Sequence, residues 1–207
     1  MKHGTLLPLA GLICTLVPTL ASAYSGGPPD RFASNPPFDQ NCTFCHFSYE
    51  VNSGDGDLQI LGLPSEFVPG QTYPLTVMLE DPGQQRWGFE LTVLDDADDF
   101  AEGGSLVVTD PLNTQISEDV EGTEDYLKHT SEGTHWPSDG PTSWNFDWTA
   151  PDLPSVTFYF CGNAADGDQS FVGDYIYARS TTVTRREVTP VAETSWGRVK
   201  SLYVAKR

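Results

Sequence analysis

The residues with the clearest chemistry lie in a single pentapeptide, Cys42-Thr43-Phe44-Cys45-His46. The spacing C-x-x-C-H is typical of covalent attachment of c-type haem. Two thiols three residues apart reach the two vinyl groups on one porphyrin edge, and the adjacent imidazole ligates the iron. The motif therefore predicts haem c bonded to Cys42 and Cys45, with His46 as the proximal iron ligand.

A haem iron has a second axial position, and three side chains are candidates for it. They are His129, Met78 and His135. Each also has a purely structural interpretation, because an exposed strand histidine or a core methionine needs no metal. Ligation by two histidines gives a lower reduction potential than ligation by methionine and histidine.

The cysteines leave other interpretations open. A disulfide between Cys42 and Cys45, or between Cys45 and Cys161, is ordinary chemistry in an exported protein. Zinc is less favoured, since a closed site needs four ligands and Cys161, His129, His135 and carboxylates would have to complete it. A thioredoxin-like redox motif is less favoured still. Cys161 ends an apolar strand, a position typical of an inert core cysteine.

Three acidic segments form a second candidate site, for calcium. They are 53–57 (SGDGD), 95–99 (DDADD) and 163–168 (NAADGD). They place hard oxygen ligands on loops, as calcium prefers, although none has the twelve-residue EF-hand pattern. Motifs of nucleophilic, zinc-hydrolase and phosphate-loop enzymes do not occur in the sequence. We therefore expect a protein that is not an enzyme.

The elements that must position these groups read as short strands. Aromatic and β-branched runs alternate with Gly and Pro turns at the spacing of an all-β, immunoglobulin-like β-sandwich. The expected strands are 57–61, 73–79, 88–94, 105–109, 126–130, 143–148, 156–161 and 174–183. Period-two alternation predicts that Trp144, Phe146 and Trp148 share one face, as do Val156, Phe158 and Phe160.

The two ends of the chain have a different composition. Residues 1–23 have a short polar start, an apolar stretch and Ala21-Ser22-Ala23, the pattern of a cleaved secretory signal. Residues 24–40 are rich in Pro and Gly without periodicity, which predicts a flexible linker. The sandwich should occupy residues 41–185. The basic tail, residues 186–207, contains apolar residues at helical spacing and predicts a short amphipathic helix.

Charge restricts the possible partners. The chain has 207 residues and a net charge of −18, with 11 basic and 29 acidic residues. Excess carboxylate repels phosphate backbones, so nucleic acid is not expected as a partner. No stretch after the signal could span a bilayer. We expect an exported protein that is periplasmic, secreted or at the cell surface, and an acidic surface that could attract a basic redox partner.

The order of several motifs resembles the bacterial reelin-like (Reeler) domains, many of which carry CxxCH ahead of the sandwich. The matching stretches span roughly Asn41–Tyr177 and are CTFCH, LGLPSEFVPGQTYPLTVML, RWGFELTVLD, YLKHTSEG, SWNFDWTAPD and VTFYFCGNAADGD. The resemblance implies an exported, often surface-attached sandwich. It also places His129 within the shared pattern, which ranks it above Met78 and His135 as distal ligand. Cys161 departs from the pattern, where a small residue is usual.

Together these observations lead to two functional hypotheses. The first is a single-haem electron-transfer protein built on residues 41–185. The second is a haem-free adhesion or ligand-binding module in which the cysteines serve structure, because animal reelin-type domains are matrix and adhesion modules and a fold alone does not define a function.

Overall fold

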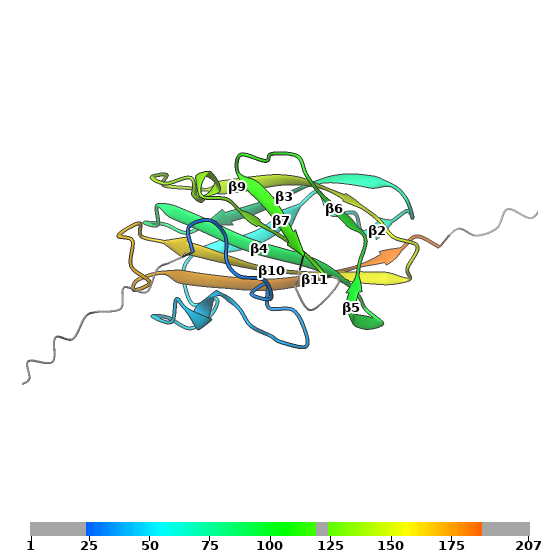
Figure 1. The fold of residues 1–207 in the computed structure, drawn as a ribbon, viewed down its shortest axis with the longest axis horizontal. Helices are drawn as coiled ribbons and strands as arrows, with labels where there is room; N and C mark the ends of the chain where they lie inside the picture. The colour runs from blue at the N-terminus through cyan, green and yellow to red at the C-terminus, as the bar shows by residue number, and fades with distance from the viewer. Residues whose placement is uncertain (1–23, 119–123, 188–207) are drawn as a thin grey trace, which may run out of the picture.

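The structure is a computed structural model that describes residues 24–118 and 124–187. It is built almost entirely of antiparallel strands in two layers (Figure 1). The strands are β1 (Asp57–Leu61), β2 (Glu66–Phe67), β3 (Thr72–Glu80), β4 (Arg86–Asp95), β5 (Asp98–Glu102), β6 (Ser105–Val108), β7 (Thr114–Glu118), β8 (Asp125–His129), β9 (Thr142–Thr149), β10 (Ser155–Ala165) and β11 (Tyr175–Arg185). Two short 3₁₀ turns, η1 (Cys42–Phe44) and η2 (Glu132–Thr134), complete the described elements.

The strands form a β-sandwich, as the sequence predicts. One sheet has four strands in the order β1-β3-β9-β6. The other has seven, in the order β2-β11-β10-β4-β8-β7, with β5 paired to β4. The longest pairings join β10 to β4 and to β11, so these three strands form the centre of the larger sheet.

The core lies between the two sheets and follows the predicted alternation. Trp144 and Trp148 on β9 and Phe158 and Phe160 on β10 are fully buried, while Asn145 is exposed. Each buried indole is satisfied, since Trp144 Nε1 donates to the Gly133 carbonyl at 2.8 Å and Trp148 Nε1 to that of Gly103 at 2.9 Å. Large aromatic rings therefore fill the sandwich without leaving their polar N–H groups unpaired.

Three strands were not expected from the sequence. The strand β2 has two residues, β5 reads DDFAE and β7 reads TQISE. The strand β2 is too short to show a period, and the Asp and Glu residues of β5 and β7 are depleted in strands, which weakens the signal of Thr114 and Ile116. The acidic run Asp95–Asp99 forms the tight connection in which Asp95 of β4 pairs with Asp98 of β5.

The segment 24–40 is ordered against the larger sheet, which differs from the expected flexible linker. Figure 1 shows it crossing in front of β4, β10 and β11. Ala33 and Asn35 are fully buried, and Asn35 Nδ2 donates to Tyr126 Oη at 3.1 Å. Lys128 Nζ donates to the Pro28 carbonyl at 2.8 Å. These long-range contacts add to the few backbone hydrogen bonds within the segment, such as that from the Asp39 N–H to the Asn35 carbonyl at 2.9 Å.

This cover explains the burial of β4 on both faces. Its residues 87–94 are all buried, although only alternate ones face the core. The other set, which includes Gly88 and Glu90, faces the covering segment. The strand β4 is thus buried by the core on one face and by the covering segment on the other, where polar side chains are held away from water.

Two predicted features lie outside the described residues. They are the secretory signal of residues 1–23 and the amphipathic helix of the tail, of which only residues 186 and 187 are described. Among the residues that the structure describes, no helix has the length and apolar character needed to cross a membrane.

Candidate functional site

The turn η1 aims both motif cysteines toward the larger sheet. It begins at Asn41, whose side-chain Oδ1 accepts the Thr43 N–H at 2.9 Å. Residues three apart are eclipsed in a 3₁₀ turn, so Cys42 and Cys45 lie on the same side of it. Cys42 is half-buried and Cys45 is exposed. Local geometry therefore gives the two thiols the common direction that one porphyrin edge requires.

The turn rests on two adjacent rows of outward-facing residues. In one row, Cys161 of β10 pairs with Glu90 of β4. In the other, Asn163 of β10 pairs with Gly88 of β4. Because these positions alternate with core residues, they lie on the outer face of the sheet, directly beneath the segment that carries the motif.

His46 is held by an acidic partner from the other end of the chain. Its Nδ1 lies 2.5 Å from Oδ2 of Asp174, a carboxylate that is 1 % exposed. A histidine that donates one ring N–H to a carboxylate presents its other nitrogen as a metal ligand. The Asn163 amide nitrogen lies 3.4 Å from His46 Nε2, a long contact that a bond to iron would replace.

His129 is buried at the end of β8 with a fixed ring. Its Nδ1 lies 3.0 Å from the Phe89 backbone nitrogen and 3.1 Å from the Phe89 carbonyl oxygen. Burial lowers the pKa of His129 to about 4, so the imidazole is neutral at pH 7. A Cβ on Gly88 would lie 2.7 Å from the ring, so only glycine leaves room for this placement.

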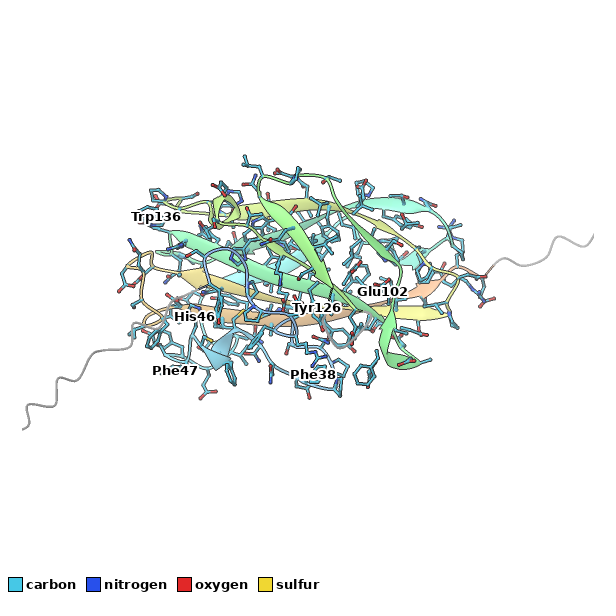
Figure 2. The ribbon with its side chains drawn as sticks, in the orientation of Figure 1. Phe38, His46, Phe47, Glu102, Tyr126 and Trp136 are labelled. Atoms are coloured by element: carbon cyan, nitrogen blue, oxygen red, sulfur yellow. The ribbon has the colours of Figure 1, made fainter. Side chains whose placement is uncertain are left out.

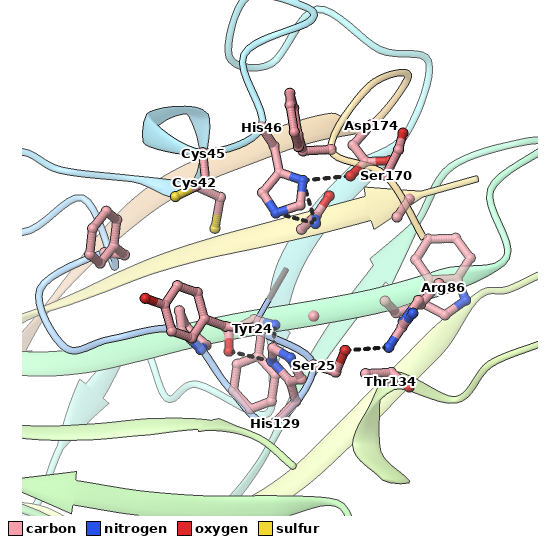
Figure 3. Close-up of a pocket in the computed structure, with 18 of the residues that line it drawn as sticks. Tyr24, Ser25, Cys42, Cys45, His46, Arg86, His129, Thr134, Ser170 and Asp174 are labelled. Atoms are coloured by element: carbon pink, nitrogen blue, oxygen red, sulfur yellow. Dashed lines mark hydrogen bonds and ion pairs between the residues drawn. The ribbon is translucent and has the colours of Figure 1, made fainter. Parts of the chain in front are cut away.

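These groups share one cavity of about 260 Å³. Cys42, Cys45 and His46 line it from the motif, and His129 lines it from β8. Figure 3 shows His46 and the two cysteines on one side of this space and His129 on the other. The structure therefore brings the CxxCH motif together with the first-ranked distal ligand, although 83 positions separate His46 from His129 in the sequence.

The remaining walls combine aromatic rings and one guanidinium with small and polar residues. Tyr24, Phe32, Trp87 and Phe171 contribute rings, and Arg86 is held by a 2.6 Å hydrogen bond to Ser25 Oγ. Phe47 also lines the cavity and is 66 % exposed, so it marks the rim. Figure 2 shows Phe47 beside His46, at the opposite end of the sandwich from Glu102.

Cys161 does not face the sandwich core, in contrast to the interpretation of it as an inert core residue. It is fully buried, but on the outer face of β10, where its Sγ lies 3.1 Å from Cys42 Sγ. The sequence suggested disulfides between Cys42 and Cys45 or between Cys45 and Cys161. The structure contains none of these bonds and instead places the free thiol of Cys42 next to that of Cys161, because η1 lays Cys42 directly over this position.

A buried polar group next to the site gave no signal in the sequence. Glu90 is fully buried, and its Oε2 accepts the Phe32 N–H at 2.6 Å. Lys128 Nζ lies 3.9 Å from Glu90 Oε1 and 2.5 Å from Asp30 Oδ1. Burial raises the pKa of Glu90 well above its ordinary value, and the Lys128 charge opposes that rise. Only the strand register reveals this group, since Glu90 and Lys128 are cross-strand partners.

The two other candidate distal ligands are not brought to the cavity. Met78 lies on the outer face of the four-stranded sheet, because Leu75, Val77 and Leu79 take the inward positions of β3. His135 follows η2 in a left-handed conformation, with its ring 5.6 Å from that of Trp144. Because Met78 lies on the other sheet, it does not reach the cavity that holds the CxxCH motif.

The acidic segments proposed for calcium use several oxygens in their own turns. Asp95 Oδ1 accepts the Ala97 N–H at 3.0 Å, and Asp166 Oδ1 accepts the Asp168 N–H at 2.9 Å. Such bonds explain acidic residues at turns without a metal. Within residues 24–118 and 124–187, no cluster of three or more His, Cys, Asp or Glu side chains suited to a metal ion occurs. Calcium binding stays an untested prediction.

Comparisons with known proteins give structural neighbours only. No family model matches the chain, and no curated protein matches it. A reeler domain of human F-spondin has 17 % identity and a TM-score of 0.46, covering 66 % of this chain and 93 % of that one. The Reelin-N domain of F-spondin has 18 % identity and a TM-score of 0.46, with 70 % and 97 % covered.

A cohesin module from a Clostridium perfringens family 33 glycoside hydrolase is also similar. It has 12 % identity and a TM-score of 0.43, covering 65 % of this chain and 98 % of that one. Similarity at this level says nothing about the function of this chain, which has to be argued from its own site.

Proposed function

We propose that this chain is an exported, non-enzymatic electron-transfer protein that carries one covalent haem c. Cys42 and Cys45 would form the thioethers, with His46 as proximal and His129 as distal iron ligand. One observation carries the proposal: the CxxCH motif and a second, neutral histidine line the same cavity.

The two imidazoles are prepared for this role by their partners. In the tautomer that suits this role, Nδ1–H of His46 donates to Asp174 and Nδ1–H of His129 donates to the Phe89 carbonyl. In each ring Nε2 is then the nitrogen left for a metal, and the partner fixes the orientation of the ring. Neutrality at pH 7 means that His129 does not have to lose a proton before it binds iron.

The other lining residues suit a flat, largely apolar group with carboxylates on one edge. Aromatic rings give the cavity apolar surface, and Arg86 would provide a cation for an acidic substituent. The bound haem would supply a one-electron couple, and two histidine ligands together with a low-polarity pocket set its potential. The protein's task is to hold the two nitrogens in place and to keep water away.

The surface charge suits transient contact with a basic redox partner. The chain carries a net charge of −18, and the exposed rings of Phe44, Phe47 and Tyr24 lie at or beside the cavity. Opposite charge speeds encounter, and a small apolar contact next to the haem edge allows brief docking. Export to the periplasm or the cell surface is part of the proposal, since haem is attached to thiols outside the cytoplasm.

The test is production in a host that matures c-type cytochromes. We expect a covalent haem spectrum and a mass increase on the order of 600 Da for the product. His46→Ala should abolish the low-spin spectrum, and His129→Ala should convert it to a high-spin spectrum while the added mass stays. His135→Ala is the matched control, since this third histidine lies against Trp144 rather than at the cavity. A colourless product without added mass would refute the proposal.

A second candidate is a haem-free surface module that binds another protein or a small apolar ligand. The exposed aromatic rim at the cavity favours it, because exposed apolar patches often mark contact sites. The same intact-mass measurement separates the two candidates, since only the first predicts the haem increment.

A further inference from the structure

The cysteine pair formed by Cys42 and Cys161 has no part in iron ligation. Cys161 donates to Cys42 at an Sγ–Sγ distance of 3.1 Å, and the Cys42 backbone N–H points to Cys161 Sγ at 3.4 Å. The two residues are 119 positions apart. Both are free thiols in the structure. A small approach would bring the sulfurs to the bonded distance of about 2.05 Å.

The surroundings distinguish this pair from any involving Cys45. Cys161 is fully buried on β10 and is covered by η1, which places Cys42 over it. Cys45, at the end of the same turn, is exposed. Of the three cysteines that follow the signal, the buried one therefore has one close sulfur neighbour, and Cys45 is left for other chemistry.

We propose that Cys42 and Cys161 form a reversible disulfide in the haem-free exported protein. We further infer that this bond competes with haem attachment at Cys42, a consequence that rests on the proposed function. While the disulfide is present, Cys42 cannot react with haem. Reduction of the disulfide releases the Cys42 thiol to form the thioether.

The chemistry needs an external dithiol–disulfide carrier as oxidant. Cys42, the more accessible thiol of the pair, attacks the carrier disulfide and forms a mixed disulfide, releasing one carrier thiol. The thiolate of Cys161 then attacks the Cys42 sulfur and expels the second carrier thiol. Two cysteine thiols lose two electrons and two protons in total, and the carrier disulfide gains them as a dithiol.

The pocket keeps this exchange slow without such a carrier. The hydrogen bond to Cys161 and burial both raise the pKa of the Cys42 thiol, and the nearby Glu90 carboxylate acts in the same direction. Since the thiolate is the reactive form, spontaneous oxidation at neutral pH is disfavoured. The raised pKa of Cys42 also slows oxidation of the reduced pair while haem is being attached.

The first experiment counts thiols in haem-free protein exported by a host that lacks cytochrome c maturation. Denaturation in N-ethylmaleimide without reductant should label one cysteine, Cys45, and prior reduction should raise the number to three. Trypsin should release residues 32–86 linked to residues 129–179, because Arg31, Arg86, Lys128 and Arg179 bound these peptides. Three labels without reduction would overturn the proposal.

Variants identify the pair. Cys45→Ser should keep the linked peptides, and Cys161→Ser should lose them. A linkage that disappears in Cys45→Ser and persists in Cys42→Ser would overturn the pairing. Reduction should lower the Tm of the haem-free wild type by roughly 10 °C, because the bond closes a long loop. The Tm of Cys161→Ser should not respond to reductant.

The second experiment applies the same label to haem-loaded protein. The labelled residue should change from Cys45 to Cys161, since Cys42 and Cys45 are then both thioethers. If no haem attaches, the proposed function fails, but the thiol count of the haem-free protein still decides whether the disulfide forms. If haem attaches and the haem-free protein shows three free thiols, only the disulfide proposal fails.

Discussion

The two outer faces of the sandwich are built by the same alternation but have opposite environments. On the four-stranded sheet, the outward positions of β3 and β9 hold residues such as Thr76 and Asn145, whose side chains form a 2.8 Å hydrogen bond at the surface. On the seven-stranded sheet, the outward positions of β4 and β10 hold Glu90 and Cys161, which are fully buried. The difference is the cover supplied by the N-terminal segment.

The covered face shows why the candidate site lies where it does. A polar group on an open face is satisfied by water, so its identity has little consequence. Under a cover, each polar or ionisable group needs a specific partner, because water cannot satisfy it. Glu90 with Lys128, His46 with Asp174 and Cys42 with Cys161 all occur on or under this face. Three substitutions, ordered from the largest to the smallest expected effect on the free energy of unfolding, test this difference between the covered and the open face.

The largest effect is expected from Lys128→Met. The substitution removes the cation next to buried Glu90 and the donor to Asp30 and to the Pro28 carbonyl. Breaking a buried ion pair by removing one partner costs about 4 kcal/mol. Urea unfolding of the haem-free protein measures the loss.

The control for that change is an exposed ion pair. Arg179 and Asp57 are each 46 % exposed and lie 3.3 Å apart. Arg179→Met should cost less than about 1 kcal/mol, because solvent screens such pairs. Equal losses for the two variants would mean that the covered face is not a true interior.

The second effect is a pH dependence carried by His129. Burial lowers its pKa from 6.5 to about 4, so folding favours the neutral ring. The stabilisation is complete above pH 6.5 and is lost as the pH falls toward 4, where the unfolded chain binds a proton that the folded chain does not. The loss amounts to about 3 kcal/mol between pH 7 and pH 4.

His129→Gln should remove this loss in the haem-free protein. The measurement is the free energy of unfolding in urea at several pH values between 7 and 4, and the difference between wild type and variant should shrink as the pH falls. His135→Gln is the control, because the pKa of this partly exposed ring is lowered less. A difference that stays constant with pH would contradict burial of a neutral His129.

The smallest effect is expected on the open face. Thr76→Ala removes the exposed hydrogen bond to Asn145 and should change the free energy of unfolding by less than about 0.5 kcal/mol. The haem spectrum of the loaded protein should be unchanged. If Thr76→Ala lowered the free energy of unfolding by more than about 1 kcal/mol, the loss would equal that expected for a buried group. The distinction between the two faces would then be wrong.

Prediction from the sequence succeeded where a local period exists. The alternation in β9 and β10 placed Trp144, Phe146, Trp148, Val156, Phe158 and Phe160 in the core, as observed. It failed where stability comes from distant partners. Residues 24–40 have no period, and they are ordered by contacts such as Asn35 with Tyr126, 91 positions away. No local pattern encodes such a contact.

The site divides in the same way. The CxxCH motif follows from the sequence. The 3₁₀ turn that gives its two thiols a common direction, and the partners of the motif, do not. The resemblance ranks His129 above Met78, and the assignment of their strands to different sheets places only His129 of the two at the cavity.

By itself, the sequence determined the spacing of the CxxCH motif, the all-β class and the faces of the strongly alternating strands. These properties depend on neighbours within a few residues, where backbone geometry is fixed. The tertiary structure decided which groups meet: His46 with Asp174, Cys42 with Cys161, and the motif with His129 across one cavity. Strand register and sheet order set these distances, and both arise from packing of the whole chain rather than from any segment of it.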